Sequence, residues 1–209
     1  MQSRFLHIDD TKTWDAFREG NQAAFEYIYQ VYFQTLYNYG KKFSKDDALI
    51  GDTLQQLFTE LWQKRKKLGA TDQIKNYLYK SFRRALLRNQ KKQDKNASEG
   101  SALSFGISLS YEAQVIQQQH DREQMEALQQ AISQLTEKQR EVIYFKFYDG
   151  LSYAEISEIM EISSAQVYDF MYKALGALRK KVKKSEAYSI FTSSTITFFL
   201  IYTLLSIFL

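Results

Sequence analysis

The sequence contains no cysteine and no proline, and its 209 residues include only eight glycines and two histidines. Without cysteine there is no disulfide and no thiolate metal site. His7 and His120 have no partner in the sequence, so we expect surface positions for both and neither a metal nor a cofactor. The lack of proline and the few glycines favour long helices over a fold of strands and turns.

Charge is only mildly unbalanced. Lys and Arg number 28 against 24 Asp and Glu, which gives a net charge of +4. That excess suits a nucleic-acid partner without requiring one. The N-terminus reads MQSRFLH followed by charges, so we expect no signal peptide. The sequence has no glycine-rich phosphate loop and no catalytic cluster, and we expect no enzymatic activity.

The last part of the chain, residues 187–209, carries no charge and follows a cluster of lysines. A helix that crosses a membrane needs roughly 20 such residues, and flanking lysines would remain on the cytoplasmic side. We expect a hydrophobic C-terminal helix here, either a membrane anchor or a tail docked on the protein or a partner. The protein would then be cytoplasmic, with a possible tether to the inner face of the membrane.

Three segments of the N-terminal half have apolar residues at helical spacing. They are Phe25–Tyr37, Ile50–Trp62 and Ile74–Ala85. Each has one apolar stripe, so the three helices must pack together to bury these stripes. We place this first domain at residues 14–90 and expect a flexible polar linker at 91–111.

The second domain is expected at residues 112–184. Three helix starts in it have a hydroxyl residue followed three positions later by Glu or Gln, the pattern of a capping box. The pairs are Thr136 with Gln139, Ser152 with Glu155, and Ser163 with Gln166.

The last two of these helices, separated by the brief turn Met160–Ile162, form a predicted helix-turn-helix, which places its second helix in the major groove of DNA. The residues expected to face DNA are Ser164, Gln166, Tyr168, Asp169, Tyr172 and Lys173. The end of the helix adds Arg179, Lys180, Lys181, Lys183 and Lys184, which attract phosphates. The alternative is a helical hairpin with a solvated polar face.

The third helix of the first domain offers another basic surface. At about 100° per residue, Lys80, Arg83, Arg84 and Lys91 share one face, with Arg88 at its margin. Such a face suits a phosphate backbone, although solvated basic faces are common.

The helix before it differs, because its exposed positions between Asp52 and Glu60 are polar and carry no basic residue. This pattern suits a protein partner rather than DNA, and an ordinary soluble face is an equal alternative.

These segments resemble the extracytoplasmic-function (ECF) subfamily of sigma-70-type RNA polymerase sigma factors. Region two is matched by Asp52-Thr53-Leu54-Gln55-Gln56-Leu57-Phe58 ending at Leu61-Trp62, followed by Tyr77-Leu78-Tyr79. Region four is matched by Leu135-Thr136-Glu137-Lys138-Gln139-Arg140-Glu141-Val142 and by Leu151-Ser152-Tyr153-Ala154-Glu155-Ile156. The resemblance covers nearly all of residues 14–182, in family order.

The resemblance implies an all-α protein of two small helical domains that initiates transcription. The segment Lys80–Arg88 would engage the −10 element of promoter DNA, and the helix Ser163–Leu175 would read the −35 element. The core polymerase clamp would be bound by Asp52, Gln55, Gln56 and Trp62. The resemblance also implies an anti-sigma factor as a partner.

The chain departs from the family pattern at four places. Gln56 stands where a Glu is common, and Arg84 where an Asn is often found. Asp169 replaces a basic or polar residue in the recognition helix. Glu161 takes the place of the turn glycine, which costs about 1 kcal/mol if the position has a positive φ.

Two other functions remain open at this stage. One is a helix-turn-helix regulator that binds duplex DNA without polymerase, which leaves the first domain without a role. The other is a membrane-anchored interaction protein that uses the hydrophobic tail.

Overall fold

A computed structural model describes residues 9–96, 105–106 and 128–182 of the chain. All regular elements in these ranges are helices, which confirms the predicted all-α class. The chain divides into two compact units, Met1–Ser104 and Phe105–Leu209. We call them unit 1 and unit 2.

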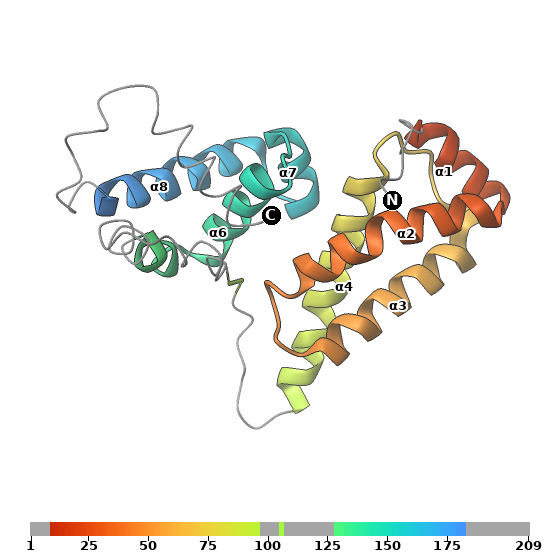
Figure 1. The fold of residues 1–209 in the computed structure, drawn as a ribbon, viewed down its shortest axis with the longest axis horizontal. Helices are drawn as coiled ribbons and strands as arrows, with labels where there is room; N and C mark the ends of the chain where they lie inside the picture. The colour runs from red at the N-terminus through yellow and green to blue at the C-terminus, as the bar shows by residue number, and fades with distance from the viewer. Residues whose placement is uncertain (1–8, 97–104, 107–127, 183–209) are drawn as a thin grey trace, which may run out of the picture. The chain divides into compact units, whose positions relative to one another are not determined.

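Unit 1 is a bundle in which three long helices run side by side (Figure 1). Its elements are α1 (Asp10–Glu19), α2 (Gln22–Gly40), α3 (Asp47–Lys64), the 3₁₀ turn η1 (Arg65–Lys67) and α4 (Ile74–Asn96). The three predicted helices are therefore present. The short helix α1 was not predicted, and it packs against α2 and η1.

The core of unit 1 is rich in aromatic rings. Trp14 and Phe17 of α1 are fully buried, and the Trp14 indole donates a 2.8 Å hydrogen bond to the Gly69 carbonyl. The helices approach closely at Gly40, where a Cβ atom would lie 2.9 Å from Ile50 Cγ2 and 3.1 Å from Phe82 Cζ. A glycine at this position lets α2, α3 and α4 pack closely around Gly40.

The helix α4 extends further than expected. It continues to Asn96, so the first residues of the predicted linker are helical. Lys, Gln and Asn after Gln90 give no apolar periodicity, but Lys and Gln are good helix formers and extend a helix that packing has already started. Phe105 also differs from the prediction. It falls in the predicted flexible linker, yet it is buried, with only 1% of its surface exposed.

Unit 2 contains a helical segment at residues 128–133 and four further elements. They are α6 (Glu137–Ile143), the π-helical turn η3 (Tyr144–Tyr148), α7 (Tyr153–Met160) and α8 (Ser164–Val182). Both α6 and α7 pack against α8. Residues 107–127, like the uncharged tail at 187–209, lie outside the described residues. Within the described ranges, no helix is long and apolar enough to span a membrane.

The three predicted capping boxes are all formed. The Thr136 and Ser152 boxes have both reciprocal hydrogen bonds. At Ser163, the backbone N–H donates to Gln166 Oε1 at 3.0 Å, and the Gln166 N–H donates to Ser163 Oγ at 3.2 Å. These bonds satisfy backbone donors at each helix start, and they set where α6, α7 and α8 begin.

Candidate nucleic-acid interface

The turn between α7 and α8 is held by local hydrogen bonds and one unusual backbone conformation. Glu161 ends α7 with φ 58° and ψ 44°, the left-handed conformation that the missing turn glycine suggested. Ser157 Oγ donates a 2.6 Å hydrogen bond to the Ile162 carbonyl, and the Ile162 N–H donates to the Ser157 carbonyl. The turn therefore connects α7 to α8 through a short, hydrogen-bonded segment, and the two helices pack against each other.

One side of α8 is buried in unit 2 and the rest is exposed. The buried residues are Val167, Met171, Ala174 and Leu178. The exposed residues include all six that were predicted to face DNA: Ser164, Gln166, Tyr168, Asp169, Tyr172 and Lys173. Arg179 and Lys180 are exposed at the end of the helix, whereas the side chains of the lysines after them lie outside the described residues. The first half of α8 thus presents a continuous accessible surface.

Three of the six candidate side chains are already engaged within α8. Gln166 Oε1 accepts hydrogen bonds from the backbone N–H and the hydroxyl of Ser163, the latter at 3.2 Å. Asp169 and Lys173 form an ion pair at 2.8 Å. The Lys173 charge offsets the phosphate repulsion that Asp169 would otherwise produce. A DNA ligand would therefore meet a locally neutral polar face here.

Tyr168 belongs to a small cluster that the sequence did not reveal. Its ring lies 4.3 Å from the ring of Tyr153, at the start of α7. Lys146 Nζ lies 5.0 Å from the Tyr153 ring centroid and donates to the Leu151 carbonyl. The ring contact with Tyr153, which Lys146 holds through its cation–ring contact, orients Tyr168 before any ligand binds.

The predicted basic face of α4 is present in unit 1. Arg84, Arg88 and Lys91 are exposed, and Lys80 and Arg83 are half-buried. The opposite side of α4 carries the buried residues Leu78, Phe82 and Ala85.

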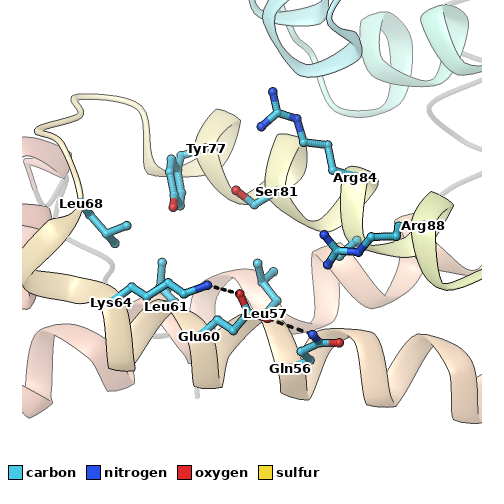
Figure 2. Close-up of a pocket in the computed structure, with 11 residues that line it drawn as sticks. Gln56, Leu57, Glu60, Leu61, Lys64, Leu68, Tyr77, Ser81, Arg84 and Arg88 are labelled. Atoms are coloured by element: carbon cyan, nitrogen blue, oxygen red, sulfur yellow. Dashed lines mark hydrogen bonds and ion pairs between the residues drawn. The ribbon is translucent and has the colours of Figure 1, made fainter.

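A groove of about 260 Å³ lies between α3 and α4 (Figure 2). Glu60 accepts hydrogen bonds from Gln56 at 2.9 Å and Lys64 at 2.6 Å. The Lys64 bond, then the Gln56 bond and the nearby charge of Arg88, hold the pKa of Glu60 below its usual value. Arg84 lines the groove, with its guanidinium pointing away from α3 in Figure 2. Residues predicted to bind DNA and a residue predicted to bind polymerase thus lie around the same groove.

The residues predicted to bind polymerase are not equivalent. Asp52, Gln55 and Gln56 are exposed on α3. Trp62 is half-buried, its ring 5.0 Å from Phe25, with the Arg65 guanidinium 4.2 Å above it. Trp62 therefore contributes to the edge of the unit 1 core and presents only part of its ring to a partner. Among the described residues, no cluster of His, Asp and Glu could hold a metal ion.

Unit 2 contains a helix-turn-helix whose second helix is accessible, and unit 1 contributes a basic helix. Together these features are typical of a helix-turn-helix DNA-binding protein.

Residues 125–178 match the family model described as Sigma-70, region 4. One curated relative is ECF RNA polymerase sigma factor SigM of Bacillus subtilis (strain 168), 26% identical, with 73% of this chain and 91% of the relative covered. Another is ECF RNA polymerase sigma factor SigK of Mycobacterium ulcerans (strain Agy99), 24% identical, with 77% and 86% covered.

Two solved structures have the same fold. CnrH in complex with the cytosolic domain of CnrY matches with a TM-score of 0.56 and 15% identity, covering 84% of this chain and 97% of that chain. The sigma factor RpoE in complex with the anti-sigma factor NepR, from Bartonella quintana, matches with a TM-score of 0.54 and 17% identity, covering 77% and 97%. Most of the chain is thus similar to ECF sigma factors, and residues 125–178 match sigma-70 region 4, which together support a role in directing RNA polymerase to promoters.

Proposed function

We propose that the two units divide promoter recognition between them. Unit 2 binds the −35 element through α8. Unit 1 contacts the −10 element through α4 and the clamp of core RNA polymerase through α3. The chain performs no covalent chemistry, and promoter opening draws on its affinity for unpaired DNA. The observation that carries this proposal is the exposed first half of α8 in a capped helix-turn-helix.

The shape and charge of unit 2 support its role at the −35 element. A helix-turn-helix places the start of its second helix against base edges. The first half of α8 is accessible over six candidate residues, and Arg179 and Lys180 are exposed beyond it. Cations at the end of the helix attract phosphates without reading sequence, which leaves specificity to the earlier residues.

In unit 1, the exposed residues of α3 and α4 differ in charge, which supports separate partners for the two helices. Basic residues at three exposed positions make α4 attractive to phosphates, whereas α3 exposes Asp52, Gln55 and Gln56. Carboxylate and amide groups suit a polar protein interface better than a DNA backbone. Since both helices border one groove, core enzyme and DNA would lie close together on unit 1.

We further propose an anti-sigma factor as a partner. The two solved structures described above are both complexes, and in one of them the sigma factor RpoE is bound to the anti-sigma factor NepR. Such a partner would act by covering surfaces that polymerase or DNA would otherwise bind.

The protein would act in the cytoplasm, where its polymerase partner is found. The uncharged tail at residues 187–209 would tether it to the inner face of the membrane. Carbonate-washed membranes should retain the full-length chain and lose a chain truncated at Ser185. Equal release of both chains would contradict the tether and leave the polymerase role unaffected.

A binding experiment with core polymerase separates this proposal from a regulator that acts on duplex DNA alone. The full-length chain should be retained by immobilised core enzyme at moderate salt, and Gln55→Arg should weaken that retention. The matched control is Gln22→Arg, a substitution of another exposed glutamine, on α2. Absence of binding by the unmodified chain would support the regulator. Equal losses for both variants would remove α3 as the interface.

A further inference from the structure

The exposed face of α8 is partly apolar. Among the described residues, the large apolar side chains that are exposed are Tyr29, Tyr168, Tyr172 and Leu175. Three of these four lie on α8 at spacings of four and three residues, which places them on one face of the helix. Tyr168 is 56% exposed, Tyr172 is 81% exposed and Leu175 is 37% exposed.

The apolar face formed by Tyr168, Tyr172 and Leu175 lies beside polar residues that already bind one another. Gln166 closes the capping box with Ser163, and Asp169 pairs with Lys173. These bonds occupy Gln166 Oε1, one Asp169 carboxylate oxygen and one Lys173 proton, which leaves fewer groups free to hydrogen-bond to bases. The Tyr168 and Tyr172 rings can contact a ligand without breaking any of these bonds.

Thymine is the base that presents an apolar group in the major groove. Its C5-methyl group distinguishes it there from the other three bases, and apolar side chains read it by contact. We infer that α8 selects its DNA site through contacts of Tyr168 and Tyr172 with thymine methyl groups. This inference rests on the proposed function, because it requires α8 to enter the major groove.

Two features favour DNA as the ligand of this face. The exposed cations Arg179 and Lys180 follow this apolar face on the same helix and attract phosphates. In addition, Tyr153 at the start of α7 contacts the Tyr168 ring and orients it, and Lys146 of η3 lies over the Tyr153 ring. An oriented ring loses little side-chain freedom on binding, so it can discriminate a single methyl group.

The test compares two promoter duplexes that differ only in methyl groups. Holoenzyme formed with the full-length chain is titrated against a promoter chosen by run-off selection, with thymine or deoxyuridine in its −35 element. Burial of one carbon predicts about fourfold weaker binding for each contacted methyl group that is removed. A third duplex with deoxyuridine only in the spacer is the control, and it should bind as the thymine duplex does.

The variants Tyr172→Ala and Tyr172→Phe assign the effect to the side chain. Tyr172→Ala should bring the thymine-to-deoxyuridine ratio towards one, and Tyr172→Phe should preserve it. Because Tyr172 is 81% exposed, neither change removes a core side chain. Tyr168→Ala should act in the same direction, with a circular dichroism spectrum recorded to verify its fold.

The outcomes separate this inference from the function on which it rests. Equal binding of the two duplexes, or a ratio that Tyr172→Ala and Tyr168→Ala both leave unchanged, overturns the inference while α8 remains a −35 reader. A holoenzyme that protects no −35 DNA, with or without thymine, contradicts the proposed function itself.

Discussion

Arg140 donates a hydrogen bond from its Nε to the backbone carbonyl of Phe105, 35 residues earlier in the chain. The same guanidinium donates to the carbonyls of Leu135 and Ser133, and Arg140 is only 9% exposed. The Phe105 ring packs edge-on against Tyr144 at 5.7 Å. A buried cation and an aromatic ring thus attach the start of unit 2 to its core.

We expect Arg140→Leu to destabilise unit 2 by about 2 kcal/mol or more, because it leaves buried carbonyl acceptors without a donor. Both tryptophans of the chain, Trp14 and Trp62, lie in unit 1. Urea unfolding followed by circular dichroism should therefore shift, while the tryptophan fluorescence transition should remain in place. Coincident shifts of both signals would contradict a local role for Arg140.

Glu161→Gly should stabilise unit 2 by about 1 kcal/mol, since glycine adopts the left-handed conformation without the steric cost of a Cβ atom. Among the described residues, Glu161 is the only non-glycine residue with a positive φ. Chemical denaturation of the variant and the unmodified chain measures the difference. Glu158→Gly, a substitution of an exposed glutamate within α7, is the matched control and should be destabilising.

Replacing Lys80, Arg83 and Arg84 together by Ala should weaken promoter opening. If these cations contact the phosphates of unpaired DNA, the dependence of log affinity on log salt should become shallower by up to roughly 2. Open-complex yield, measured over a range of salt concentrations, tests both effects. Replacing the exposed Lys66 and Lys67 of η1 is the control for charge loss, and an unchanged yield in the triple variant would remove α4 as the −10 reader.

Gln166→Ala tests whether a capping residue also reads bases. Loss of the Gln166 contact to the Ser163 N–H should lower the stability of unit 2 by about 1 kcal/mol, the usual size of a cap. A base contact would add a change of about 1–3 kcal/mol in −35 preference. A randomised −35 library measures that preference, and a stability loss with unaltered preference would leave Gln166 as a cap only.

Local patterns in the sequence predicted much of this fold. The apolar stripes gave α2, α3 and α4, and the hydroxyl and Glu/Gln pairs gave the starts of α6, α7 and α8, because both signals act within one or two helical turns. The Glu161 conformation followed from one missing glycine. The short helix α1 offered too few apolar positions to establish a period, although Asp9 caps it.

The features that were not predicted depend on contacts between distant residues. Nothing near Phe105 in the sequence indicates that Arg140 and Tyr144 bury it. The contact between Tyr153 and Tyr168 depends on the angle between α7 and α8, which the turn conformation sets. The α3–α4 groove likewise brings Gln56 and Arg88 together only after the bundle has formed.

Run-off transcription with core RNA polymerase on a pool of random promoters tests the central claim most directly. The full-length chain should direct transcripts of defined length from templates that share a −10 and a −35 element, and core enzyme alone should not. Transcripts no different from those of core enzyme alone, from a chain whose circular dichroism shows it to be folded, would contradict the account.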